Sequence, residues 1–218
     1  MSLLELSNVS YAVKDKTIIN DISLSIESGD YVSIVGPSGS GKSTLLKLCS
    51  DLISPTSGCI TYEGQDIRTI TPEVYRQSVG YCFQRPYLFA KTVRRNILFP
   101  YDIRNMKPDM ARIEYLFDLL QMPMDYFNRR NDELSGGEMQ RICLIRSLIF
   151  EPKILLLDEV TSALDAKNTI VVEGLIEELH KHGVTIVSIT HNEDQSLRHA
   201  NRRITIVDGA IQQEEVLR

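Results

Sequence analysis

Apolar and polar positions alternate in short runs through the first third of the chain, and turn residues separate these runs. Runs rich in β-branched residues between such turns are typical of strands. The pattern predicts strands over residues 3–13, 17–28, 31–36 and 58–67. A glycine-rich loop follows the third of these, and apolar residues at helical spacing then predict a helix over 43–53.

The pattern changes after a further predicted strand at 78–83. The chain then carries prolines and charges up to about residue 133, and the helical spacing of 108–122 predicts a helical region. Beyond it, helices alternate with nearly all-apolar strands, which indicates a parallel sheet covered on both faces and an α/β fold class. The predicted order is a helix over 135–150, a strand at 153–158, a helix at 168–183, a strand at 184–190 and a strand pair over 204–213.

The composition is that of an ordinary globular chain and excludes little. The 218 residues suffice for one large domain with a real core. A net charge of −5 argues against a general nucleic-acid binder, and we expect no nucleic-acid partner. We also expect no membrane span and no secretory signal, and the four cysteines lack metal-ligand spacing and are expected to be reduced thiols.

The loop after the predicted strand at 31–36 fits the phosphate-binding pattern G-x-x-x-x-G-K-[ST]. Its glycines let backbone amides turn towards phosphate oxygens, and the helix that follows points its positive end at them. The lysine adds charge near the β- and γ-phosphates, and the next hydroxyl can ligate Mg²⁺. An accidental glycine-rich turn would not need the flanking strand and helix. The predicted phosphate-binding residues are Gly36, Pro37, Ser38, Gly39, Ser40, Gly41, Lys42, Ser43 and Thr44.

Two carboxylates end the apolar run ILLLDE at 154–159. Ligands bind at the carboxyl ends of the strands in open α/β sheets, so Asp158 is expected to hold Mg²⁺ through water. Glu159 would then orient or deprotonate an attacking water. The alternative is a strand that merely ends in two solvated carboxylates, and the phosphate-binding loop upstream weighs against it.

A second glycine pair opens the helix predicted from 135 onwards, in the segment LSGGEMQR. Ser135 and Glu138 fit a capping box, which would only start the helix. Glycine costs about 1 kcal/mol relative to alanine inside a helix, however, and a cap does not require Gly136 or Gly137. These glycines would bare the helix-end amides for an anion. From these residues alone, both interpretations stay open.

Four segments in this order resemble the ATP-binding cassette (ABC) ATPases, and the resemblance covers essentially the whole chain. They are GPSGSGKST, LSGGE, ILLLDE and SALD. The resemblance implies ATP and Mg²⁺ as cofactors, and a RecA-like P-loop NTPase fold with an N-terminal antiparallel β subdomain and a helical subdomain. It implies one domain over 1–218, in which 1–84 and 151–218 form the nucleotide-binding core and 85–150 the helical subdomain.

The resemblance also assigns roles to particular residues. In that family the LSGGE segment is the signature motif, and two subunits pack head to tail so that each signature motif closes over the ATP of the other. Tyr11 matches the aromatic residue that stacks on adenine, and Gln84 matches the glutamine that contacts Mg²⁺ and the water. His191 matches the histidine that touches the γ-phosphate, and Asp165 in SALD matches the loop that couples the two sites.

The absence of a membrane segment implies that separate permease subunits would carry the transported substrate, with the ATPase cytoplasmic on the inner face of the membrane. The segment QRPYLFAKTVRRNI is similar to exporter-type cassettes, and the finer sequence resembles short stand-alone iron or metal export subunits. The apolar cluster at 87–89, beside Arg94 and Arg95, would form a groove for a permease helix. Its alternative is core packing of the helical lobe.

Two other functions compete with that of an ATPase that drives transport. A soluble ABC ATPase that clamps a protein or nucleic-acid complex would carry basic surface or inserted arms, and this acidic, compact chain shows neither. A nucleotide-binding regulator without turnover would lack part of the hydrolytic set, yet Lys42, Asp158, Glu159 and His191 are all present.

Overall fold

The computed structural model describes residues 2–190 and 192–217, and the fold contains two sheets. The first is an antiparallel sheet of four strands in the order β2-β1-β4-β5. Its strands are β1 (Ser2–Val13), β2 (Lys16–Glu27), β4 (Ser57–Tyr62) and β5 (Gln65–Asp66). This sheet is the predicted N-terminal β subdomain.

The second sheet has six strands in the order β10-β9-β3-β8-β7-β6, and all neighbours in it are parallel except β10 and β9. Because the strands are parallel, the loops that follow β3, β6, β7 and β8 meet at one edge of the sheet. The strands are β3 (Tyr31–Val35), β6 (Val79–Cys82), β7 (Ile154–Asp158), β8 (Thr185–Ile189), β9 (Arg202–Val207) and β10 (Ala210–Val216).

Two apolar cores meet across the parallel sheet. Ile154 and Leu156 of β7 pack into a core that also holds α1 and the antiparallel sheet. Leu155 and Leu157 pack on the other face, into a core shared with the helices α3 to α6. A strand that is buried on both faces reads as a continuous apolar run, and this confirms the predicted α/β fold.

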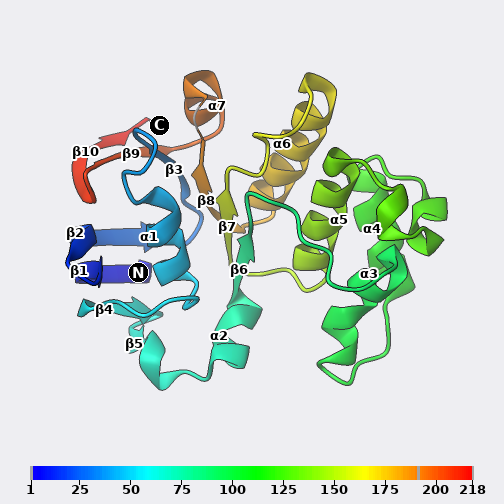
Figure 1. The fold of residues 1–218 in the computed structure, drawn as a ribbon, viewed down its shortest axis with the longest axis horizontal. Coiled ribbons are helices and arrows are strands. Elements are labelled where there is room, and N and C mark those ends of the chain that lie inside the picture. The colour runs from blue at the N-terminus through cyan, green and yellow to red at the C-terminus, as the bar shows by residue number, and fades with distance from the viewer. Residues whose placement is uncertain (1, 191, 218) are drawn as a thin grey trace.

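Helices cover the sheet, and three of them gather at one end. Figure 1 shows α3, α4 and α5 as a lobe beyond β6 and β7, with the antiparallel sheet at the opposite end of the molecule. The helices are α1 (Lys42–Cys49), α2 (Pro72–Ser78), α3 (Val93–Asp102), α4 (Met110–Leu119), α5 (Gly136–Leu148), α6 (Ala166–Lys181) and α7 (Glu193–Arg198). No helix within residues 2–190 and 192–217 is both long and apolar enough to cross a bilayer.

Several predicted boundaries were wrong. The helix expected to reach residue 53 ends at Cys49, because Asp51 adopts a left-handed conformation with φ of 54°. The strand expected over 58–67 is split by a turn, because Glu63 and Gly64 both have positive φ. Helix α2 was not predicted, although Thr71 followed by Pro72 is a common way to start a helix.

Candidate functional site

The phosphate-binding loop lies between β3 and α1, and its glycines are required by the surrounding backbone. Gly36, Gly39 and Gly41 all have positive φ, at 143°, 80° and 100°. A Cβ on Gly36 would lie 2.0 Å from the carbonyl oxygen of Ile206, and one on Gly41 would lie 2.8 Å from that of Ile18. The loop therefore packs so closely against β9 and β2 that only glycine fits at these two positions.

Lys42 begins helix α1 and turns back into the loop. Its Nζ donates to the carbonyl oxygens of Gly36, at 2.9 Å, and Pro37, at 2.8 Å. Burial lowers the pKa of Lys42, while the carboxylates of Glu159 and Asp158 act in the opposite direction. The α1 N-terminus carries no side-chain cap, so its first amides are directed at the loop. The Lys42 cation, the amides at the start of α1 and the glycines of the loop together form a site that suits a chain of phosphates.

Asp158 ends strand β7 with both carboxylate oxygens held. Ser43 Oγ donates to Oδ1 at 2.8 Å, and Tyr81 Oη donates to Oδ2 at 2.7 Å. Burial, together with the neighbouring Asp158, raises the pKa of Tyr81, so its phenol stays protonated and can donate. Tyr81 belongs to none of the sequence motifs described above. The signal for it in the sequence was a hydroxyl-bearing side chain within β6, the strand that pairs with β7.

Glu159 and Gln84 lie together beside the loop. Gln84 Nε2 donates to Glu159 Oε2 at 2.6 Å, which joins the end of β6 to the end of β7. Glu159 adopts a left-handed conformation with φ of 49°, a strained geometry for a residue with a side chain and one that clusters at functional sites. Both side chains line a cavity of about 300 Å³, together with Ile18 and with residues 38–39 and 41–44 of the phosphate-binding loop, or P-loop. We call it the P-loop cavity.

The oxygen donors around this cavity fit a magnesium ion. Ser43, Asp158, Glu159 and Gln84 all offer oxygen atoms, and Mg²⁺ prefers hard oxygen ligands. The two hydrogen bonds among them bring four predicted site residues from three elements into one cluster.

The LSGGE segment is capped by its own side chains. Ser135 Oγ accepts from the Glu138 amide at 3.3 Å, and Glu138 Oε2 accepts from the Ser135 amide at 2.7 Å, which completes the capping box. Tyr126 Oη donates to Glu138 at 2.6 Å, and this hydroxyl is the main cause of the lowered pKa of Glu138. Ser135 and Gly136 are exposed, and within the described chain α5 contributes no residue to the P-loop cavity.

The SALD loop packs against this segment. A Cβ on Gly137 would lie 3.3 Å from Leu164 Cδ2, and Arg141 of α5 donates to Asn168 Oδ1 at 2.6 Å. Asp165 caps α6, because its Oδ1 accepts from the Asn168 amide at 2.8 Å. The signature helix and the SALD loop thus form one continuous surface.

The structure describes one further residue that was predicted to contact the nucleotide, Tyr11. Tyr11 is half-buried on β1, where it packs against the apolar core and pairs with Ile19 of β2. Ile18, the neighbour of that partner, lines the P-loop cavity. His191 lies outside the described residues.

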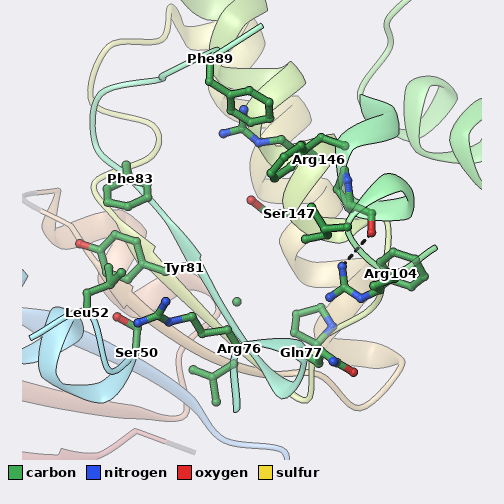
Figure 2. A pocket seen from close by; sticks show the side chains of 17 residues that line it. Ser50, Leu52, Arg76, Gln77, Tyr81, Phe83, Phe89, Arg104, Arg146 and Ser147 are labelled. Atoms are coloured by element: carbon green, nitrogen blue, oxygen red, sulfur yellow. Dashed lines mark hydrogen bonds between the residues drawn. The ribbon is translucent and has the colours of Figure 1, made fainter. Parts of the chain in front are cut away.

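A second cavity, of about 310 Å³, lies between the parallel sheet and the helical lobe. Figure 2 shows Phe83, Phe89, Arg146 and Tyr81 around it. The Phe89 ring packs edge-on against Phe99, with centroids 4.5 Å apart, and the Arg146 guanidinium lies 5.0 Å from it. Phe89 is 44% exposed and Tyr87 71% exposed, so neither is part of the core.

Comparison with known proteins places the chain in a family. The model of the ABC transporter family matches residues 19–162. The chain is 45% identical to a probable iron export ATP-binding protein, FetA, of Escherichia coli, over 98% of this chain and 95% of that relative. It is 38% identical to a sulfate/thiosulfate import ATP-binding protein, CysA, of Pectobacterium atrosepticum, over 96% of this chain but only 65% of the relative.

A solved structure matches over the full length. The dimeric post-hydrolysis state of the ATP-binding cassette MJ0796, bound to ADP and phosphate, superposes with a TM-score of 0.89 at 29% identity and covers 99% of both chains. The phosphate-binding loop, the carboxylates at the end of β7 and these matches agree. The chain belongs to the ABC transporter family, as an ATP-binding subunit that hydrolyses ATP to power transport.

Proposed function

We propose that the chain is the ATPase subunit of a metal exporter and that its cargo is iron. The observation that carries this proposal is the 45% identity to the probable iron export protein over 95% of its length. The import relatives are less similar, at 32–38% identity, and this chain spans 59–78% of their length. In this role the chain is held at the inner face of the cell membrane by separate permease subunits. The clamp alternative gains no support, because these relatives are transport proteins.

The test is transport by the assembled complex. The tagged chain is purified from membranes with its permease and reconstituted into vesicles with the ATPase facing outwards. ATP should drive Fe²⁺ into the vesicles, and the complex carrying Glu159→Gln should not accumulate it. ATP-driven loss of preloaded iron, or transport of sulfate in place of iron, would overturn the proposal.

The proposed hydrolytic roles combine the chemistry of the residues around the P-loop cavity with the roles that the family resemblance implies. Lys42 and the loop amides bind the β- and γ-phosphates of ATP, and Tyr11 stacks on the adenine. Ser43, Asp158 and Gln84 hold Mg²⁺, which supplies charge neutralisation on the phosphates. Glu159 orients and deprotonates the attacking water, and His191 contacts the γ-phosphate.

The signature segment acts on the nucleotide of a second copy in an ATP-dependent, head-to-tail homodimer. Ser135 and Gly136 are exposed and do not line their own P-loop cavity, and both facts support this assignment, as does the dimeric cassette that this chain resembles. Light scattering of Glu159→Gln should show monomer without nucleotide and dimer with ATP. A stable dimer in nucleotide-free buffer would contradict the assignment.

The second cavity, which surrounds Phe89, forms a groove that receives a short helix of the permease. Phe83, Phe89 and Phe99 supply an apolar wall, and Arg104 and Arg146 supply positive charge, so the fitting occupant is an amphipathic helix with a carboxylate. Tyr87 and Arg94, which the sequence grouped with Phe89, are not among the residues that line the groove. They would contact the helix from the rim.

A matched pair of surface variants tests this docking. Phe89→Ser should leave the ATPase of the isolated chain intact but weaken its association with the permease at least tenfold. The control is Val216→Ser, because Val216 is 76% exposed on β10, far from the helical lobe (Figure 1). Equal retention of the permease by both variants would exclude the groove as the docking surface.

A further inference from the structure

Tyr81 touches two separate sites with one side chain. Its hydroxyl donates to Asp158 Oδ2 at 2.7 Å, in the cluster proposed to hold magnesium. Its ring lines the apolar groove and packs edge-on against Phe83, with centroids 4.6 Å apart. Figure 2 shows both rings on the same side of the groove. Gln84, which the family resemblance assigns to Mg²⁺ and the water, donates to Glu159.

The strand register explains how a tyrosine reaches the carboxylate. Tyr81 of β6 pairs with Leu156 of β7, and side chains two residues apart on a strand point to the same face. Asp158 therefore lies on that face, one diagonal step beyond Leu156. A diagonal neighbour is within reach of an aromatic side chain, and the phenol spans this step.

The contact leaves each oxygen of the Asp158 carboxylate with a defined donor. Ser43 holds Oδ1 and Tyr81 holds Oδ2. When Ser43 turns to a metal ion, Tyr81 remains to fix the orientation of the carboxylate. Hydrogen bonds of this kind to a metal-ligating group typically change metal affinity 10- to 100-fold.

We infer that Tyr81 is a positioning residue that orients Asp158 for the metal and links this carboxylate to the floor of the groove. Displacement of the Phe83 and Tyr81 rings by an occupant of the groove then moves the hydroxyl that holds Asp158. The orienting role concerns the isolated chain alone. The link to an occupant rests on the proposed docking of a permease helix.

The experiment measures the contribution of Mg²⁺ to ADP binding, because ADP avoids both turnover and the ATP-dependent dimer. Calorimetric titrations with ADP are made in saturating Mg²⁺ and in EDTA, and the ratio of the two affinities is the readout. Tyr81→Phe keeps the ring and removes the hydroxyl. It should reduce the ratio roughly tenfold, at the lower end of the cited range, and leave the affinity in EDTA unchanged.

Two controls separate this role from a general loss of structure. Tyr115→Phe removes a phenol from the exposed face of α4 and should leave the ratio unchanged. In an Asp158→Asn background, Tyr81→Phe should have no further effect, because coupled residues are not additive. An unchanged ratio in Tyr81→Phe, or an equal loss in the Asp158→Asn background, would overturn the positioning role.

The link to the groove has its own variant. Phe83→Leu loosens the ring contact with Tyr81 and should reduce the same ratio by about two- to threefold, with no reduction in a Tyr81→Phe background. Phe99→Leu is the control, because Phe99 lines the groove but packs on Phe89. No change in Phe83→Leu would overturn the link. That result would leave permease docking standing, because no permease is present in the measurement.

Discussion

Two glycine-rich segments of this chain each open a helix, and they use their glycines for different reasons. At the P-loop, a Cβ on Gly36 would lie 2.0 Å from a carbonyl oxygen, and both Gly36 and Gly41 have positive φ. At the signature segment, Gly136 lies at the start of a normal helix, and a Cβ there would meet no atom from elsewhere in the described chain within 4 Å.

The N-termini of the two helices also differ in how they are capped. Helix α1 has Gly41 at its N-cap position and no side-chain cap, whereas α5 begins with a complete capping box from Ser135 and Glu138. The fold of the chain therefore explains the P-loop glycines but not Gly136. Gly136 lies on an exposed helix end, and its own chain does not require a glycine there. This favours the interpretation that a second molecule requires it. This comparison supports the proposal that the signature segment closes over the nucleotide of a partner subunit.

The largest effects are expected at the P-loop, where one variant impairs ATP binding and another impairs hydrolysis alone. Lys42→Ala should weaken ATP binding and abolish turnover, because it removes the cation that lies in the phosphate-binding loop. Glu159→Gln should keep ATP affinity but slow phosphate release by about 10²–10⁴-fold, the usual contribution of a general base. Equilibrium ATP binding and steady-state phosphate release measure both variants. Turnover of Glu159→Gln near the wild-type rate would refute the general-base role.

A mixing experiment tests the signature segment against the P-loop directly. Lys42→Ala and Ser135→Arg should each be inactive as homodimers. In a mixed dimer, one composite site carries both defects and the other carries none, so phosphate release should reappear as one variant is titrated into the other at fixed total protein.

The control for this experiment is evidence that mixed dimers form, by co-purification of two differently tagged variants. If mixed dimers are present and no activity returns, Ser135 does not act on the partner's nucleotide. If Ser135→Arg alone stays active, the segment is only a helix cap.

The two glycines should also differ in stability. Gly36→Ala should destabilise the chain by about 3 kcal/mol or more, because the backbone has positive φ and the Cβ meets a carbonyl oxygen. Gly136→Ala should be neutral or stabilise by up to about 1 kcal/mol, since alanine is the better helix former. Denaturant unfolding without nucleotide measures both. A large loss of stability in Gly136→Ala would show that the fold itself needs this glycine.

The sequence predicted the site residues best where local pattern alone defines them. Lys42, Ser43 and Asp158 follow from a loop and a strand end, and the parallel sheet then brings them together. The contact of Tyr81 with Asp158 joins residues 77 positions apart, so no local pattern carries it. The groove likewise combines Phe89 of the loop after β6 with Phe99 of α3 and Arg146 of α5. The roles of all the site residues stay predictions, including the adenine contact of Tyr11 and the role of His191.

The smallest expected effect separates the two roles of Ser135. Ser135→Ala should cost about 1 kcal/mol of stability, because the Glu138 amide loses its acceptor, while Ser135→Gly should cost only a few tenths of a kcal/mol.

Both variants lack the hydroxyl. If the hydroxyl acts on the partner's nucleotide, both should lose phosphate release to the same extent although their stabilities differ. A loss of about 1 kcal/mol hardly changes the folded fraction of a domain stable by 5–15 kcal/mol, so a pure cap predicts normal turnover in both. Phosphate release and denaturant unfolding, measured on the same samples, decide between the two. Normal turnover in both variants would reduce Ser135 to a cap and leave the exposed Gly136 without an explanation.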